Sequence, residues 1–344
     1  ARVFDPNVLH RVEITVEDRY LGPLDEDLNS RVPCTLSFDG TTLTNVGIRK
    51  KGFIGSQAEL RDKPGFSIKF NEFTPKQRLF GLTKILLNNS QQDSSRMNEH
   101  LAYEIYRRAK LPAALTAHAV VRFNGKPKGI FVLKEAIDER FLERNFGEEN
   151  DQGNLYEATD QDFAEAEIEL KDEQRDMRRR DDLHALQKAI NETPNARWAE
   201  VVGQLLDLDV FITSYAIDAL VLHIDGPHFD QNNVYLYHHP GTGKFVLIPH
   251  GMDDLFGEDG SPLDRPSATT SSRIRAIPEL DARFKAELRR VLTEAWDVPA
   301  LLARIDRAVA TIRTGTAADG IISSEVGEIA DEGQSRASWL ARRK

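Results

Sequence analysis

Residues 222–257 read LHIDGPHFDQNNVYLYHHPGTGKFVLIPHGMDDLFG, and this stretch decides more about the fold than any other part of the chain. Two short apolar runs, at 234–238 and 244–248, flank the turn formers Pro-Gly-Thr-Gly and predict a β-hairpin. Because a hairpin brings its two ends together, the Asn pair at 232–233 and Asp253 are expected to lie side by side. One amide oxygen and one carboxylate are hard donors of the kind that Mg²⁺ prefers.

A helix candidate leads directly into this stretch. Apolar residues dominate 205–222, and the chain then passes Asp225, the Asn pair and the hairpin before it reaches Asp253 and Leu-Phe-Gly. Protein-kinase-like active sites show the same order, with a helix, a loop carrying Asp and Asn, a hairpin and an Asp-Phe-Gly metal ligand. Single acidic or amide residues in such segments are often only turn formers. Their joint order favours a phosphoryl-transfer site, although the absence of a His-Arg-Asp triplet excludes an ordinary eukaryotic-type kinase.

The carboxylate expected to meet the acceptor hydroxyl is Asp225, because the helix delivers it directly. Asp230 is a rival, since the interval from Asp225 to Asn233 is longer than in ordinary kinases. Asn233 and Asp253 are the predicted metal ligands. Several histidines crowd the same stretch, but no pair has a recognised zinc-motif spacing, so they are expected to be hairpin and loop residues. They are His223, His228, His238, His239 and His250.

Composition restricts only the broad class of protein to which the chain can belong. The chain has 344 residues, 40% of them hydrophobic and 29% charged, which is ordinary for a folded protein with two lobes or one large α/β domain. Its net charge of −10 argues against a general nucleic-acid binder, and no stretch predicts a membrane span. The single cysteine, Cys34, excludes an internal disulfide and a cysteine-based metal cluster, and its apolar run predicts a core position. Because the chain begins at Ala1 without a Met, a processed N-terminus and a secreted or cell-surface location are open.

The first part of the chain is predicted to be mostly β. Strand signals cover 10–16, 32–38, 41–49 and 65–70, with Asp39-Gly40 as a hairpin turn. A helix at 96–109, two strands at 117–123 and 129–133 joined at Asn124-Gly125, and a helix at 135–145 follow. This order predicts an α+β, bilobal, protein-kinase-like fold, with a β-rich small lobe at 1–135 and a mainly helical large lobe at 136–344. In the large lobe, 157–200 is read as a solvated helical insertion, 258–276 as a loop and 280–344 as closing helices.

Three features of the first part suit a nucleotide. Gly52 and Ser56 belong to a turn between strands, where glycine lets the backbone N–H groups approach phosphate. Alternation places Phe66, Ile68 and Phe70 on one strand face, so that Lys69 projects from the other face as a kinase strand lysine does.

A kinase-like lysine needs a carboxylate from the following helix. Glu99 and Glu104 both qualify, and Glu99 is preferred because it is nearer the N-terminal end. Glu135 falls at the lobe boundary, where a hinge would meet the adenine, or else serves as a helix-start carboxylate.

At this point the chain resembles the bacterial spore coat protein CotH kinase-like family, whose members look like remote relatives of protein kinases. The resemblance covers residues 10–260 and combines several motifs. They are Lys63-Pro64-Gly65-Phe66-Ser67-Ile68-Lys69-Phe70, Leu86-Leu87-Asn88-Asn89 followed by EHLAYE at 99–104, Asn124-Gly125 with Gly129-Ile130-Phe131, Glu135-Ala136-Ile137-Asp138 with Phe141-Leu142, Asn154-Leu155-Tyr156 and the 222–257 stretch.

The resemblance implies ATP-dependent phosphorylation of protein Ser or Thr hydroxyls with Mg²⁺ or Mn²⁺. Asp225 then resembles the catalytic Asp, Asn233 the metal-side Asn and Asp253 the Asp-Phe-Gly-like ligand, with Lys69 neutralising phosphate charge. Family members often carry Trp-Asp-x-Asp where this chain has His250-Gly251-Met252-Asp253, so a first acid is missing at Gly251. Two alternatives therefore stay open, a pseudokinase or adhesin-like binding protein, and transfer of AMP from ATP.

Overall fold

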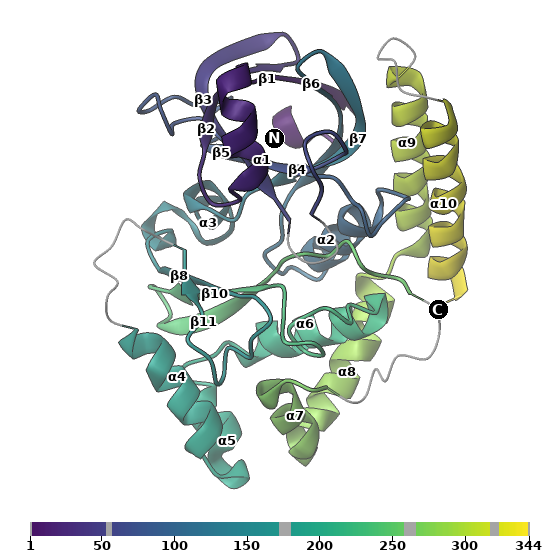
Figure 1. The fold of residues 1–344 in the computed structure, drawn as a ribbon. Coiled ribbons are helices and arrows are strands. Elements are labelled where there is room, and N and C mark those ends of the chain that lie inside the picture. Colours follow the sequence, from purple (N-terminus) through teal and green to yellow (C-terminus); the bar gives the residue numbers. More distant parts are fainter. Residues whose placement is uncertain (1, 53–56, 172–179, 258–265, 317–322, 343–344) are drawn as a thin grey trace. The chain divides into compact units, whose positions relative to one another are not determined.

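The computed structural model describes residues 2–52, 57–171, 180–257, 266–316 and 323–342 (Figure 1). The described residues form an α+β structure, which confirms the α+β part of the predicted fold class, while the bilobal kinase-like layout stays a prediction. They group into two compact units. The first unit comprises the described residues of 1–101, 114–141 and 298–342, and the second those of 102–113 and 142–297.

Seven strands of the first unit close into a barrel within the described residues (Figure 1). Neighbouring strands run antiparallel, except that the first and the sixth pair in parallel and close the ring. In order around the barrel they are β1 (Leu9–Thr15), β2 (Val32–Phe38), β3 (Thr41–Lys51), β4 (Gly65–Lys69), β5 (Lys84–Asn88), β7 (Lys126–Glu135) and β6 (Thr116–Phe123).

Two tight turns fix the register of the hairpins, as the sequence predicts. Asp39-Gly40 and Asn124-Gly125 all have positive φ, which is the backbone of the hairpin turn that matches strand twist. The Asn124 side chain adds two bonds to the first strand: its Oδ1 accepts from the Val16 N–H at 2.7 Å, and its Nδ2 donates to the Val16 carbonyl at 2.9 Å. This asparagine therefore fastens the β6–β7 turn to the end of β1.

The barrel interior is the core of the first unit. Alternate residues of each strand point inward, so Phe66, Ile68 and Phe70 are buried there, which confirms the predicted alternation around Lys69. Cys34 is also a core residue, as predicted, and burial raises the pKa of its thiol to about 12. The side chains that alternate with these point out of the barrel, where several of them are charged.

Helices of the first unit lie outside the barrel. They are α1 (Leu21–Glu26), the start of α2 (Asn98–Arg108), α9 (Val298–Gly315) and α10 (Ser323–Arg342). Glu325 of α10 accepts from Lys63 Nζ at 2.9 Å and from the Ile130 N–H at 3.1 Å. The Arg11 guanidinium donates to the Gly315 carbonyl at 2.9 Å. These contacts attach the C-terminal helices to the barrel, which corrects the expectation that they close the large lobe.

The second unit is built around a small antiparallel sheet in the order β11-β10-β8-β9. The hairpin predicted at 234–248 forms β10 (Val234–His239) and β11 (Lys244–Pro249), and the other two strands are β8 (Asn154–Ala158) and β9 (Glu169–Leu170). The helices with it are α3 (Glu139–Phe146), α4 (Asp181–Glu192), α5 (Asn195–Val202), α6 (Leu208–Val221), α7 (Thr269–Ala276) and α8 (Pro278–Glu294).

The helix that precedes the candidate site, α6, is buried almost all round. Its residues from Phe211 to Val221 are all buried, which explains the continuous apolar run in the sequence. Asp207 caps its start by accepting from the Val210 N–H at 3.1 Å. Its end is set by Leu222, whose φ of 57° turns the chain out of the helix toward Asp225.

Three other expectations differ from the structure. Residues 84–88 form strand β5, which the sequence pattern does not predict, because the run is short and its buried residues Ile85 and Leu87 are explained only by the barrel core. Residues 269–276 form a helix rather than a loop, since buried Ile274 and the following Pro278 helix give them a partner that composition does not reveal. Residues 183–190 form the predicted helix, but Leu183, Leu186 and Ile190 are fully buried, so one face packs and the other is solvated.

The Asn124 anchor leads to a stability prediction. Replacing Asn124 with Ala removes two hydrogen bonds and puts a residue that tolerates positive φ less well than asparagine at this position, so the free energy of unfolding should fall by about 2–4 kcal/mol. The matched control is Asn45→Ala, because Asn45 has φ 53°, is exposed and makes no hydrogen bond among the described residues. In Asn45→Ala the free energy of unfolding should fall by only about 1 kcal/mol. Equal losses in urea unfolding would show that the Val16 bonds contribute nothing.

Candidate functional site

Asp225 is held by both asparagines that precede the hairpin. Its Oδ1 accepts from Asn232 Nδ2 at 2.9 Å, and its Oδ2 accepts from Asn233 Nδ2 at 2.7 Å. Asn233 Nδ2 also donates to the Asp225 main-chain carbonyl at 2.8 Å. Amide donors on both oxygens fix the plane of this carboxylate. The structure thus brings Asp225 and Asn233 together.

The two ends of the hairpin are also joined, as the sequence predicts. Val234 pairs with Pro249 at the base of the hairpin, and the His250 N–H donates to the Asn233 carbonyl at 3.2 Å. Asn233 itself has φ 57°, in the left-handed region that asparagine tolerates best after glycine. Strained backbone of this kind is typical of functional loops.

Gly251 lies directly against the Asn233 side chain. A β-carbon at position 251 would sit 2.2 Å from Asn233 Oδ1, and Gly251 has φ 56°. An acid at this position would therefore have to displace Asn233. The missing first acid has a physical reason in this chain, because the Asn233 amide fills the space that its side chain would need.

Asp253 is buried two residues further on, with 8% of its surface exposed. The segment behind it is tied to α6 by the Phe256 N–H, which donates to the Val221 carbonyl at 2.8 Å. Asp230 differs from both acids, since it is exposed and its carboxylate makes no hydrogen bond or ion pair among the described residues. The fold therefore holds the Asp225 carboxylate in a defined orientation, whereas the described residues do not orient the Asp230 carboxylate.

A buried polar network lies behind Asp225. Asp218 of α6 accepts from the Tyr106 hydroxyl at 2.7 Å and lies 3.3 Å from His223 Nδ1. Burial opposes a charge on His223, but Asp218, Asp225 and the Gly251 carbonyl outweigh it and raise the pKa of His223 above its ordinary value. Gly226 permits this packing, because a β-carbon there would sit 2.6 Å from His223 Nδ1.

His228 extends the same network with the opposite titration. Its Nδ1 lies 2.9 Å from Ser271 Oγ, its Nε2 lies 3.4 Å from Ser214 Oγ, and its ring stacks on Tyr215. Complete burial lowers the pKa of His228 to about 4. His228 is thus a neutral core residue, in agreement with its predicted structural role.

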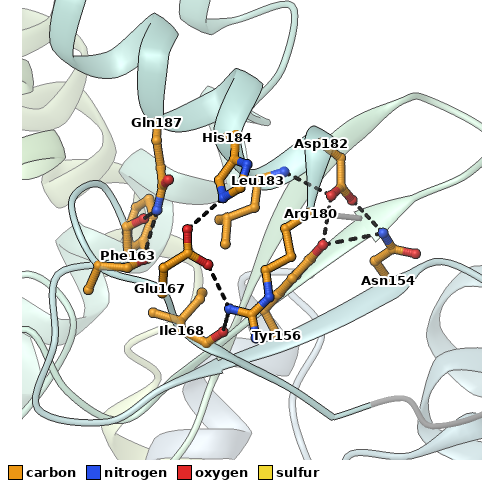
Figure 2. A network of polar contacts seen from close by, with 11 residues as sticks. Asn154, Tyr156, Phe163, Glu167, Ile168, Arg180, Asp182, Leu183, His184 and Gln187 are labelled. Atoms are coloured by element: carbon orange, nitrogen blue, oxygen red, sulfur yellow. Dashed lines mark hydrogen bonds and ion pairs between the residues drawn. The ribbon is translucent and has the colours of Figure 1, made fainter. Parts of the chain in front are cut away.

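The remaining histidines of the stretch also have structural roles. His238 Nδ1 lies 2.9 Å from Asp182 Oδ2, and Asp182 also accepts from Tyr156 and from Asn154, each at 2.6 Å. Figure 2 shows Asp182, at the first turn of α4, with its partners Tyr156 and Asn154. His239 accepts from the Gly241 N–H in the hairpin turn at 3.1 Å.

The insertion read as a solvated helix is fastened to the sheet by charges. Glu167 lies 2.6 Å from His184 Nε2 and 2.9 Å from Arg180 Nη1, and Arg180 also donates to the Ile168 carbonyl at 2.6 Å (Figure 2). Glu157 of β8 contacts Lys171 and lies 3.5 Å from His250 Nε2. These contacts hold the described charged residues of the insertion together and join Lys171 and His250 to β8.

In the first unit, Glu99 pairs with Lys134 rather than with Lys69. Both side chains are about 98% buried, and Asn88 Nδ2 donates to the same carboxylate at 2.7 Å. Burial alone would raise the pKa of Glu99, but the charges of Lys134 and Lys51 outweigh it and lower that pKa. The preference for Glu99 over Glu104 fits this burial, since Glu104 is bonded to Arg107 and Arg108.

The predicted Lys69–Glu99 pair is therefore wrong. Lys69 points out of the barrel and lies 3.0 Å from Glu72, with 39% of its side chain exposed. The strand lysine that pairs with Glu99 is Lys134 of β7, because closure of the barrel places β7 beside the start of α2. A pattern within one strand could not reveal which neighbouring strand the helix would cover.

The other predicted nucleotide contacts are only partly described. Gly52 follows β3 directly with φ 135°, a backbone that only glycine adopts readily. Ser56 lies outside the described residues. Glu135 ends β7 and accepts from the Leu115 N–H at 3.0 Å, so it is a buried strand-end carboxylate rather than a helix start.

A cavity of about 460 Å³ in the second unit contains none of these residues. It lies between the end of α2, the end of α3 and the hairpin turn, and is lined by Arg107, Lys110, Phe146 and Thr242 among others. No three His, Cys, Asp or Glu side chains converge as a metal site in the part of the chain that the structure describes. That part also contains no helix long and apolar enough to cross a membrane.

Comparison with known proteins identifies the class. The family model described as CotH kinase protein matches residues 48–338, and the chain belongs to this family. Among curated proteins, the chain is similar to the inner spore coat protein H of Bacillus subtilis (strain 168). The two are 25% identical over 263 residues, which cover 72% of this chain and 69% of that protein. The resemblance seen in the sequence is confirmed.

The buried histidines predict how stability depends on pH. His228 is neutral in the fold and has a pKa of about 4, whereas an unfolded histidine titrates near 6.5, so the unfolded state binds more protons between these values. The free energy of unfolding must then fall as the pH falls from 6.5 to 4. Replacing His228 with Gln should reduce this slope by up to about 1.4 kcal/mol per pH unit. An unchanged slope in urea unfolding at pH 4–7 would contradict the buried neutral state.

Proposed function

We propose that this chain is an ATP-dependent phosphotransferase of the atypical kinase type, which transfers phosphate to a Ser or Thr hydroxyl of a protein. Membership of the CotH kinase protein family supports this proposal. The observation that carries it is the arrangement of Asp225 and Asn233, since one amide orients the carboxylate while its own oxygen faces the Gly251 backbone.

The residues present fit a divalent cation. Asn233 Nδ2 donates to Asp225, which directs Oδ1 to the opposite side, into the space that a β-carbon at Gly251 would fill. Asn233 Oδ1 and the Asp253 carboxylate would hold Mg²⁺ or Mn²⁺, and substrate phosphates and water would complete its coordination. A cation held by these residues would supply positive charge against the negative charge that develops on the phosphate.

Asp225 would orient the acceptor hydroxyl and accept its proton. Its carboxylate plane is fixed by Asn232 and Asn233, so the hydroxyl would meet a preorganised acceptor. The buried His223–Asp218 contact behind it keeps the loop at the end of α6 in place. Phosphoryl transfer needs little more than such positioning and charge.

The lysine that would neutralise nucleotide phosphates is Lys134 rather than Lys69. Of these two lysines, Lys134 pairs with the α2 carboxylate that a kinase-like lysine requires, whereas Lys69 pairs with Glu72. Lys51 contributes positive charge to the same place and directly precedes Gly52, at the start of the glycine-containing turn proposed to approach phosphate. Glu135 stays a proposed contact for the adenine.

Two further proposals concern an alternative function and the location of the chain. The vacant acid position at Gly251 favours a pseudokinase or adhesin-like binding protein as the second candidate function. The relative's name refers to a spore coat, and we propose a coat or cell-surface location for this chain.

The carboxylate assignment predicts which variants lose activity. With Mn²⁺ or Mg²⁺ and ATP labelled at the γ phosphate, Asp225→Asn and Asp253→Ala should each lower transfer to protein at least about 100-fold. Asp230→Asn is the matched control and should stay within about threefold, because its carboxylate is exposed and unbonded. Circular dichroism and urea unfolding would verify that each variant is folded.

The same assay separates the alternatives. Transfer from ATP labelled at the α phosphate would replace the kinase proposal by AMP transfer. No transfer of either label, together with tight binding of a protein partner, would leave the pseudokinase.

The lysine assignment has its own test. Replacing Lys134 alone would remove the ion-pair partner of the buried Glu99 carboxylate, which costs about 3–5 kcal/mol, so Lys134→Met is combined with Glu99→Leu to remove both charges of the pair. The double variant should fold and raise the KM for ATP at least about tenfold, whereas Lys69→Met should leave KM within about twofold. A larger rise of the KM for ATP in Lys69→Met than in the double variant would assign the nucleotide role to Lys69 instead.

A further inference from the structure

Four cations gather on the outer face of β3, β4 and β5. Lys69 and Lys84 are direct cross-strand partners in the β4–β5 ladder, so their side chains leave the barrel on the same side. Arg49 of β3 stands beside them, opposite Ser67 of β4. Arg31 crosses the same strands and donates to the Ser67 carbonyl at 2.6 Å and to Ser67 Oγ at 2.9 Å. We refer to Arg31, Arg49, Lys69 and Lys84 as the barrel cation cluster.

The nearby acids neutralise only half of this charge. Glu72 lies 3.0 Å from Lys69 Nζ and 3.9 Å from Arg31 Nε. Asp138 faces Lys84, but its Oδ2 accepts from the Thr83 hydroxyl at 2.7 Å and its Oδ1 from the Arg140 N–H at 3.1 Å. Four cations against two carboxylates leave an excess of about two positive charges, in a chain whose net charge is −10.

Repulsion between its cations makes the barrel cation cluster unfavourable for the stability of the fold. Burial lowers the pKa of Lys84, and Arg31, Lys69 and Arg49 lower it further against the attraction of Asp138. Burial and Arg49 likewise lower the pKa of Arg31 to about 10. Among the described residues the Lys84 ammonium has no hydrogen bond or ion pair. Like charges placed directly opposite in a sheet destabilise it, so these positions are not explained by folding alone.

We infer that the barrel cation cluster binds a dianionic phosphate group, with Lys84 as its central ligand. A phosphomonoester carries about two negative charges at neutral pH, which matches the excess of the cluster. Two guanidinium groups and two ammonium groups on one rigid sheet supply the donors that phosphate recognition requires. Binding would give Lys84 a direct ion-pair partner, which the described residues do not provide.

This site is separate from the one proposed for the nucleotide. It contains neither Lys134 nor Glu99, and it needs no residue of the second unit and no divalent cation. The inference therefore does not rest on phosphate transfer. A phosphorylated Ser or Thr side chain and free inorganic phosphate offer the same chemistry, and the two sources are distinguished by experiment.

The test is calorimetric titration of the whole chain with inorganic phosphate and with O-phosphoserine, at constant ionic strength and with EDTA present. Lys84→Met should weaken binding at least about tenfold. Glu72→Gln should strengthen it about threefold or more, because it removes a competing carboxylate. Lys126→Met is the matched control and should change nothing, since Lys126 is an exposed lysine at the start of β7. Tighter binding of O-phosphoserine than of phosphate would identify a phosphorylated side chain as the ligand.

Several outcomes would overturn the inference. Binding that survives Lys84→Met, or that falls equally in Lys126→Met, would show a non-specific response to charge. Binding that is lost in Asp253→Ala rather than in Lys84→Met would place the phosphate at the nucleotide site. If the unaltered chain transfers no γ-phosphate but still binds phosphate in the presence of EDTA, only the proposed function is contradicted.

Discussion

The candidate site depends on the side-chain amide of Asn233. Its nitrogen donates twice to Asp225, once to the carboxylate and once to the main chain, and its oxygen fills the space above Gly251. One residue thereby fixes the orientation of the predicted catalytic acid and of the predicted metal ligand. Its left-handed backbone and the absence of a β-carbon at Gly251 are both conditions for this arrangement. The departure from the family pattern at Gly251 follows from packing at Asn233.

Burial of α6 explains why this loop is held so firmly. Nearly every side chain of the helix is buried, so its end cannot move without disturbing the core of the second unit. Asp218 of this helix contacts His223, and the Phe256 N–H donates to the Val221 carbonyl at the end of the helix. Both loop segments around the site are therefore tied to α6. Buried polar groups of this kind are costly unless satisfied, which makes their arrangement specific.

Local patterns predicted much of this structure. The apolar alternation and the Asp-Gly and Asn-Gly turns placed most barrel strands, and the turn formers at 240–243 placed the hairpin that joins Asn233 to Gly251. Closure of the barrel was not predictable, because it depends on the parallel pairing of β1 with β6, which leaves no local signal. The same closure decides that Lys134 meets Glu99, so the lysine was assigned to the wrong strand. His223 was visible two residues before Asp225, but its partner Asp218 and the Tyr106 hydroxyl that donates to Asp218 come together only in the fold.

The central claim is that Asn233 and Asp253 hold the cation that serves nucleotide phosphates. The most direct measurement is a crystal structure of the chain with Mn²⁺ and a non-hydrolysable ATP analogue, with the metal located by its anomalous scattering. We expect a metal at about 2.1 Å from Asn233 Oδ1 and from the Asp253 carboxylate, with phosphate oxygens as further ligands. Nucleotide bound with its metal on other residues, or an Asn233 side chain turned away from Asp225, would contradict it.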